Sequence, residues 1–185
     1  MDKPITIWPT QRKVDAPWIP SPVKIIYKAL LLARASEGSK FADIGCGDGR
    51  ASIIASKHFG SKSACIEVRE ELCMLSYANA VYNGVADKLT IACQDAREIE
   101  YNDYDILYIY MFPSFLEEIS KKLDEELREG ARVLTLDFPI KGWHPILMRR
   151  VVDDSGIERS IFLYVVGISN PASWRMRAFN GYPEI

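Results

Sequence analysis

The sequence has no marked excess of charge of either sign. It carries 23 basic and 25 acidic residues, which gives a formal net charge of −2 at pH 7. A protein that gains its affinity mainly from nucleic-acid phosphates shows a clustered basic excess. The chain as a whole is therefore not a protein of this nucleic-acid-binding class, although a local basic patch is still compatible with the sequence.

The sequence also lacks a long apolar run. Its strongly apolar stretches, near 25–35 and 106–112, fall well short of the roughly 20 residues that a membrane span requires. The first 22 residues hold five prolines and no apolar core of the kind found in secretory signals. We therefore expect neither membrane insertion nor secretion, and a cytoplasmic location.

Cysteine is scarce, and its spacing follows no metal-binding pattern. Cys46, Cys65, Cys73 and Cys93 form no CxxC pair and have no His beside them, so we expect no metal. Each lies in an apolar or small-residue setting, which is typical of buried free thiols. The four are therefore predicted to be reduced, in keeping with an intracellular protein.

The length allows one domain. The 185 residues are 48% hydrophobic and 26% charged, which is ordinary for a globular protein and sufficient to form one core. We predict a single domain over 1–185, with an extended proline-rich arm at 1–20, a core at 21–167 and a tail at 168–185. The core opens with Ser21-Pro22, a helix start with Ser21 as N-cap.

Strand-like and helix-like segments then alternate, which favours a parallel sheet with helices on both faces. Beyond residue 138 two strand-like runs meet at Ser155-Gly156 without a helix between them, so they predict an antiparallel pair. The fold class is α/β: a Rossmann-like, doubly wound, seven-stranded sheet, mostly parallel with a C-terminal antiparallel strand. The expected strands before that pair are 40–44, 63–67, 88–93, 104–111 and 131–138, and the expected helices after the first are 49–59, 69–82 and 114–127.

A glycine-rich segment joins the first of these strands to the helix that follows. Gly45, Gly47 and Gly49 alternate over five positions, which lets the backbone turn sharply and approach a ligand. NAD-binding proteins use the different spacing G-x-G-x-x-G. In addition, Asp43 precedes the first glycine by two residues, where a carboxylate would repel a pyrophosphate. It suits instead the cationic amino-acid end of S-adenosylmethionine, directly or through water.

Two further acids follow the next two strands. Glu67 ends the second strand, where a carboxylate can accept hydrogen bonds from a ribose diol. Asp95 ends the third strand, where it can accept from an adenine amino group while the amide of Ala96 donates to the ring. Because ligands of open α/β sheets bind at the carboxyl ends of strands, the three acidic positions predict one adenosine site.

These segments resemble the motifs of the seven-strand, class I S-adenosylmethionine-dependent methyltransferases. FADIGCGDGR is similar to their first motif, IEV to the second, CQDA to the third and DILYIYMF to the fourth, over residues 38–138. Four further segments are similar to archaeal protein-lysine methyltransferases: APWIPSPVKIIYKAL, MFPSFLEEISKKL, RVLTLDFPIKGWHP and FLYVVG. They are also similar to the mitochondrial lysine methyltransferases of the ATP-synthase c-subunit and the adenine nucleotide translocator.

The resemblance implies S-adenosylmethionine as cofactor. In that family the proline-bearing segment before the first motif covers the cofactor, and here it carries a tryptophan where a tyrosine is usual in the archaeal relatives. The expected cofactor-binding residues are Trp18, Ser21, Asp43, Gly45, Cys46, Gly47, Gly49, Glu67, Asp95 and Ala96.

The same resemblance implies methylation of lysine side chains in proteins. The N/D-P-P-Y/F tetrapeptide of enzymes that methylate amide or base nitrogen is absent, which argues against DNA as a partner. No general base is assigned, since His58 and His144 fit surface positions. A small-molecule or RNA methyltransferase stays open, because the first motif defines only the cofactor, as does a non-catalytic cofactor-binding module. The expected substrate-binding residues are Phe112, Pro113, Phe138 and Trp143.

Overall fold

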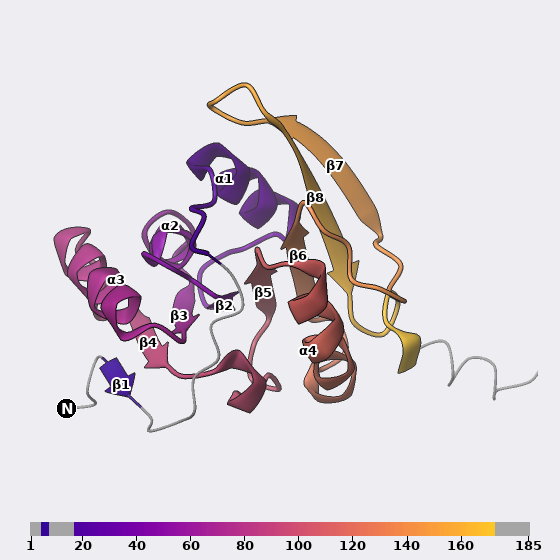
Figure 1. Cartoon of the computed structure of the whole chain (residues 1–185), viewed down its shortest axis with the longest axis horizontal. Helices are drawn as coiled ribbons and strands as arrows, with labels where there is room; N and C mark the ends of the chain where they lie inside the picture. The colour runs from indigo at the N-terminus through magenta and orange to yellow at the C-terminus, as the bar shows by residue number, and fades with distance from the viewer. Residues whose placement is uncertain (1–4, 8–16, 173–185) are drawn as a thin grey trace, which may run out of the picture.

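The computed structural model of the chain describes residues 5–7 and 17–172. Its centre is a sheet with the strand order β1-β4-β3-β2-β5-β6-β8-β7, in which β1 to β6 run parallel while β8 is antiparallel to both β6 and β7 (Figure 1). The strands are β1 (Ile5–Ile7), β2 (Lys40–Ile44), β3 (Lys62–Glu67), β4 (Leu89–Cys93), β5 (Ile106–Ile109), β6 (Arg132–Leu136), β7 (Leu147–Val152) and β8 (Glu158–Val165).

The seven strands expected from the sequence are all present, and the predicted class is confirmed. An eighth, β1, comes from the segment expected to be only an extended arm, and it pairs in parallel with β4 at the sheet edge. Three residues are too few to show the period-two pattern of a strand. The predicted strand count was therefore one too low.

Helices cover both faces of the sheet. One face carries α1 (Val23–Leu32), α2 (Arg50–Phe59) and α3 (Glu70–Tyr82), while α4 (Pro113–Glu126) packs on the other (Figure 1). The central strands β2 to β6 are largely apolar because each face there is buried beneath a helix layer. Ile26 and Leu30 of α1 meet Phe41 on the first face, whereas Leu116 of α4 meets Val133 on the second.

Helix α1 begins one residue later than expected. Its N-cap is Pro22, and Ser21 does not cap the helix through its side chain. Instead, the Tyr108 hydroxyl, next to the carboxyl end of β5, lies 3.1 Å from the Ser21 hydroxyl. The serine that was predicted as a helix cap therefore joins the segment before α1 to the centre of the sheet.

The cysteines are paired, so the expectation of reduced thiols was wrong. Disulfides link Cys46 to Cys65 and Cys73 to Cys93, with Cα–Cα distances of 5.3 and 5.8 Å. Both distances lie in the usual range of about 4.4–6.8 Å. The partners are 19 and 20 residues apart and become neighbours only when β2, β3, α3 and β4 pack together. Spacing along the chain alone gave no sign of this, and the thiol argument for an intracellular protein no longer applies.

The topology leaves a crevice between two strand ends. After β2 the chain builds β3 and β4 on one side, and it then returns to place β5 and β6 on the other. The chain leaves β2 toward β3 and leaves β5 toward β6, in opposite directions along the sheet. The gap between the carboxyl ends of β2 and β5 is the usual ligand site of such sheets. Among the described residues no helix has the length and apolar character to cross a membrane, and no cluster of side chains is suited to hold a metal ion.

Candidate active site

The glycine-rich loop follows β2 and has a left-handed backbone at each glycine. Gly45, Gly47 and Gly49 have φ values of +73°, +58° and +79°. A Cβ on Gly45 would lie 2.8 Å from the sulfur of Met111, and one on Gly47 would lie 2.2 Å from Nε1 of Trp18. Both the conformation and the close neighbours therefore require glycine.

Asp43, two residues before the loop, is a buried acid at the end of β2. Burial raises the pKa of its carboxyl well above the ordinary value of 3.8, and the nearby carboxylates of Asp48 and Glu67 raise it further. A positively charged partner would offset these costs. The position is thus suited to an ammonium group such as the one in the amino-acid part of S-adenosylmethionine.

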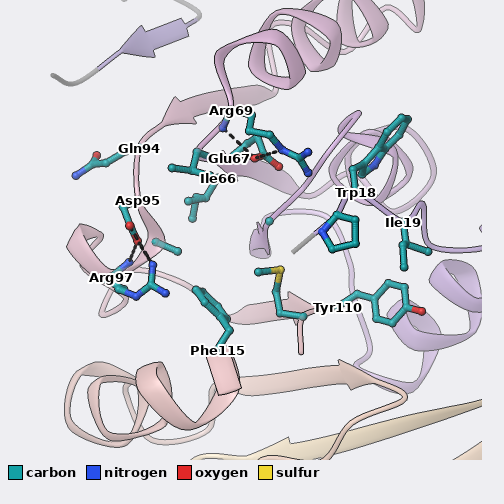
Figure 2. A pocket seen from close by; sticks show the side chains of 15 residues that line it. Trp18, Ile19, Ile66, Glu67, Arg69, Gln94, Asp95, Arg97, Tyr110 and Phe115 are labelled. Carbon is teal, nitrogen blue, oxygen red and sulfur yellow. Dashed lines mark hydrogen bonds and ion pairs between the residues drawn. The ribbon is translucent and has the colours of Figure 1, made fainter. Parts of the chain in front are cut away.

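Glu67 ends β3 and is held in one orientation by backbone amides. Its Oε2 accepts from the amide of Gly47 at 3.0 Å, and its Oε1 accepts from the amides of Val68 and Arg69 at 2.9 and 3.0 Å. Figure 2 shows Glu67 beside Arg69 at the cavity. The side chain therefore joins the glycine loop to the next strand end. Three of the roughly four acceptor sites of this carboxylate are used in this way, so Oε2 can also accept from a ribose hydroxyl.

Asp95 and Ala96 follow β4 at the start of a short 3₁₀ helix, η1 (Ala96–Glu98). Asp95 accepts from the backbone amide of Arg97 at 2.9 Å and forms an ion pair with its guanidinium at 3.0 Å. The same guanidinium lies 5.1 Å from the centre of the Phe115 ring. This end of the cleft therefore combines a carboxylate held in one orientation with an aromatic ring.

Two adjoining cavities make up the cleft, and four residues border both: Trp18, Ile19, Gly45 and Tyr110. The first cavity contains the expected acceptors Glu67 and Asp95, and the second contains Asp43. The other residues of the first are Pro17, Ile66, Val68, Arg69, Gln94, Ala96, Arg97, Met111 and Phe115; those of the second are Pro20, Ser21, Cys46, Asp48, Arg50 and Ala51.

The expected cofactor residues thus meet at one place. Eight of the ten line the cleft, and the other two, Gly47 and Gly49, shape the loop beneath it. Arg50 connects this loop to the covering segment, since its guanidinium pairs with Asp48 at 2.6 Å and donates to the carbonyl of Ser21 at 3.3 Å. The segment before α1 is therefore held against the glycine loop.

The four expected substrate residues lie outside the two cavities. Phe112 and Phe138 have ring centres 6.2 Å apart, and Phe112 is 39% exposed. Pro113 begins α4. Trp143 is only 5% exposed and packs edge-to-face on Tyr164 in the core. The structure brings the two phenylalanines together and places the tryptophan in the interior.

Sequence reasoning missed several residues of the cleft. Tyr110 and Met111 directly follow β5, so their position at a strand end was a usable signal. Phe115 and Arg97 reach the cleft through the orientation of a helix and a 3₁₀ turn, which no spacing rule predicts.

The fold and the cleft together define a class of protein: a Rossmann-like sheet with the nucleoside-cofactor site of the class I methyltransferases. A sequence profile described as the ANTKMT methyltransferase domain matches residues 43–147. The chain belongs to this family of methyltransferases, which confirms the predicted class of enzyme and the S-adenosylmethionine cofactor.

Two curated relatives are similar to the chain. A protein-lysine N-methyltransferase from Saccharolobus islandicus (strain REY15A) is 32% identical over 82% of this chain and 94% of its own length. The human lysine N-methyltransferase of the ATP synthase c-subunit is also 32% identical, over 75% of this chain. The chain spans 59% of the human protein's length.

A solved structure is similar as well. An RNA methyltransferase from Salinibacter ruber, crystallised with S-adenosyl-L-homocysteine, superposes with a TM-score of 0.74 at 28% identity. The match covers 80% of this chain and 94% of that protein. The shared fold therefore extends over nearly all of a protein that holds the demethylated cofactor.

Proposed function

We propose that the chain is an S-adenosylmethionine-dependent protein-lysine N-methyltransferase that acts on proteins with an accessible lysine. The observation that carries this proposal is the 32% identity with a protein-lysine N-methyltransferase over 94% of that relative's length. The match covers 152 residues, which is more than the residues 38–138 that carry the cofactor motifs.

The cleft fits the cofactor. Asp43 is a buried carboxyl that would be stabilised by the cofactor's ammonium group, Glu67 would hold the ribose diol, and Asp95 with Ala96 would hold the adenine. Trp18 and Ser21 would cover the bound molecule. When bound, S-adenosylmethionine supplies a methyl group on a positively charged sulfur, a group already activated for transfer.

The contribution of the protein is then to position the acceptor and exclude water. A lysine amine attacks only in its neutral form, and loss of its proton to water needs no base from the protein. Phe112, Pro113 and Phe138 would border the entry for the aliphatic stem, with Trp143 supporting them from the core. Apolar walls favour the neutral amine over the ammonium ion.

RNA methylation is a second candidate, because the similar Salinibacter structure is described as an RNA methyltransferase. The nearly balanced charge of this chain weighs against it. A small-molecule acceptor, or a module that binds the cofactor without catalysis, has no specific observation in its favour. DNA is not an expected partner. The cytoplasmic location and the single-domain organisation over 1–185 are likewise our expectations.

One experiment separates these functions. Wild-type protein and the Gly47→Val variant, whose added side chain would collide with Trp18, are incubated with labelled S-adenosylmethionine and cell extract. We expect methyl-lysine in protein hydrolysates from the wild type and none from the variant. Label recovered only in nucleosides would favour the RNA enzyme, and no transfer to any fraction would favour the binding module.

A further inference from the structure

The junction of the two cavities locates the reacting atoms. The first cavity holds the groups suited to adenosine, Glu67 and Asp95, and the second holds Asp43, suited to the amino-acid end. The sulfur of S-adenosylmethionine joins these two parts of the cofactor. In a bound cofactor it would therefore lie near the residues that border both cavities: Trp18, Ile19, Gly45 and Tyr110.

Tyr110 presents a ring, and not its hydroxyl, to this junction. The residue directly follows β5, and its ring lies beside Ile19 with the hydroxyl directed away from Glu67 and Asp95 (Figure 2). The other aromatic residue at the junction, Trp18, has its indole packed against Gly47. The Tyr110 ring is thus available to face a cation at the junction.

A charged network holds the phenol in place. Arg159 Nη1 donates to the Tyr110 hydroxyl at 3.2 Å and to Asp137 Oδ2 at 2.8 Å, while its Nε donates to Asp153 at 3.0 Å. Arg159 lies on β8, and Asp137 directly follows β6. The network therefore fastens the end of β5 to two neighbouring parts of the sheet.

The backbone at Asp137 is itself unusual. Its φ is +63°, a left-handed value that residues other than glycine rarely adopt. Two hydrogen bonds to Ser160 maintain it: the Asp137 amide donates to the Ser160 carbonyl at 2.7 Å, and the Ser160 amide donates to Asp137 Oδ1 at 3.0 Å. Such strain persists where the surroundings enforce it, commonly at functional sites.

We propose that the aromatic face of Tyr110 stabilises the positive charge at the point of methyl transfer, and that Arg159 and Asp137 are its positioning residues. The amine lone pair forms the new N–C bond while the S–C bond breaks and leaves its electron pair on sulfur. The charge thus moves from sulfur to nitrogen beside the ring, and the product ammonium later loses a proton to water. An aromatic face attracts a cation at both stages without competing for the amine lone pair.

The role of Tyr110 in cofactor recognition is tested by measuring ligand binding, without turnover. S-adenosylmethionine is charged at sulfur and S-adenosylhomocysteine is not, so calorimetry on Tyr110→Leu and Tyr110→Phe compares the two ligands. Tyr110→Leu should lose about fivefold in affinity for the charged ligand and keep its affinity for the neutral one. Tyr110→Phe, which keeps the ring but loses its anchor, should weaken the charged ligand less than Tyr110→Leu does and should leave the neutral one unchanged. Equal weakening of both ligands by Tyr110→Leu would overturn the proposal.

The positioning network is tested by a double-mutant cycle in turnover, which rests on the proposed methyl transfer to an amine. Tyr110→Phe and Arg159→Lys should each lower kcat/KM for the cofactor severalfold, because the ring contacts the positive charge both before and during transfer. The double variant should be no slower than the slower single variant, because Arg159 acts through the hydroxyl. Multiplying effects would show that Arg159 acts independently and would refute its positioning role.

A matched control is Tyr104→Phe, which removes a half-buried phenol before β5, outside the cleft, and should leave kcat and both affinities unchanged. A failure of the proposed lysine substrate is recognised separately. In that case the wild type would transfer no methyl group to lysine, while the binding contrast at Tyr110 would persist.

Discussion

The indole of Trp18 packs directly on the backbone of Gly47, so that a Cβ added to this glycine would lie 2.2 Å from Nε1. The contact joins the segment before α1 to the glycine loop and closes one side of the cleft. Gly47 also donates its amide to Glu67 at 3.0 Å. One glycine thus contacts both the covering segment and the expected ribose acceptor.

Gly47→Ala is expected to weaken S-adenosylmethionine binding more than tenfold. The new methyl group must displace Trp18 or move the loop, and either change also disturbs the amide that orients Glu67. Calorimetry measures the affinity, and thermal unfolding measures stability.

The matched control for this variant is Gly84→Ala. Gly84 has a comparable φ of +69° and nothing within 4 Å of an added Cβ, so it carries the same backbone strain without a collision. Both variants should lose roughly 1–2 kcal/mol of stability from the left-handed conformation. Equal cofactor affinity in the two variants would contradict the assigned role of Gly47.

Asp43→Asn should stabilise the protein without ligand and abolish tight cofactor binding. The folded-state pKa of Asp43 is raised, so the carboxylate costs stability, and that cost grows as pH rises from 3.8 through the folded value. The neutral amide avoids the cost, and the melting temperature at pH 7 should rise by about 2–4 °C for each kcal/mol regained.

The pH dependence gives an independent check on Asp43. The stability advantage of the asparagine variant should shrink as pH falls and Asp43 of the wild type becomes protonated. Asp103→Asn, at a side chain that is 80% exposed, serves as the control and should change neither quantity. A variant that melts below the wild type at pH 7 would show that the carboxylate makes a favourable interaction in the folded protein.

Much of this fold could be read from the chain. Each central strand is an apolar run followed by a turn signal, and the glycine loop, Glu67 and Asp95 all lie at or just after the carboxyl end of a strand. Their meeting at one crevice is a consequence of parallel strand order, so spacing and topology together were sufficient. The strand at 5–7 could not be predicted in the same way, because three residues are too few to show the alternating apolar pattern of a strand.

The remaining features depend on packing between distant elements. Arg159 lies 49 residues beyond Tyr110 and reaches its hydroxyl only because β8 returns beside β6. Ser21 looked like a helix cap, yet its hydroxyl meets Tyr108, 87 residues away. A polar side chain can form hydrogen bonds with local or with distant partners, and the local sequence does not reveal which of them it contacts in the folded protein.

Glu67→Ala is expected to lower both cofactor affinity and stability. The side chain accepts three backbone hydrogen bonds, from Gly47, Val68 and Arg69, whose amides would lose a charged acceptor. Each such bond contributes about 1.5–3 kcal/mol. The sequence alone predicts Glu67 as a ligand of the ribose and does not reveal this structural role.

Glu67→Gln separates the two roles. The amide keeps the length and one acceptor oxygen, so stability should recover in part, while the loss of charge should still reduce affinity for the ribose diol. Paired calorimetry and thermal melts on the two variants give the comparison. Wild-type affinity in Glu67→Gln would mean that the charge has no part in binding.

The two disulfides are matched in loop length but not in position, which makes each a control for the other. They close loops of 19 and 20 residues, so removing either should cost a similar free energy of unfolding, about 3 kcal/mol in the chain-entropy description. Only the bond from Cys46 to Cys65 anchors the glycine loop, whose amides at Gly45 and Cys46 also donate to the carbonyl of Ile66.

We therefore expect the paired variant Cys46→Ser, Cys65→Ala to lose both stability and cofactor affinity. The pair Cys73→Ser, Cys93→Ala should lose stability with a smaller loss of affinity, because that bond joins α3 to β4, neither of which carries the glycine loop. Alkylation of the denatured, unreduced wild type should find no thiol, since all four cysteines are paired. Four reactive thiols, with both paired variants melting at the wild-type temperature, would show that the protein folds without these bonds.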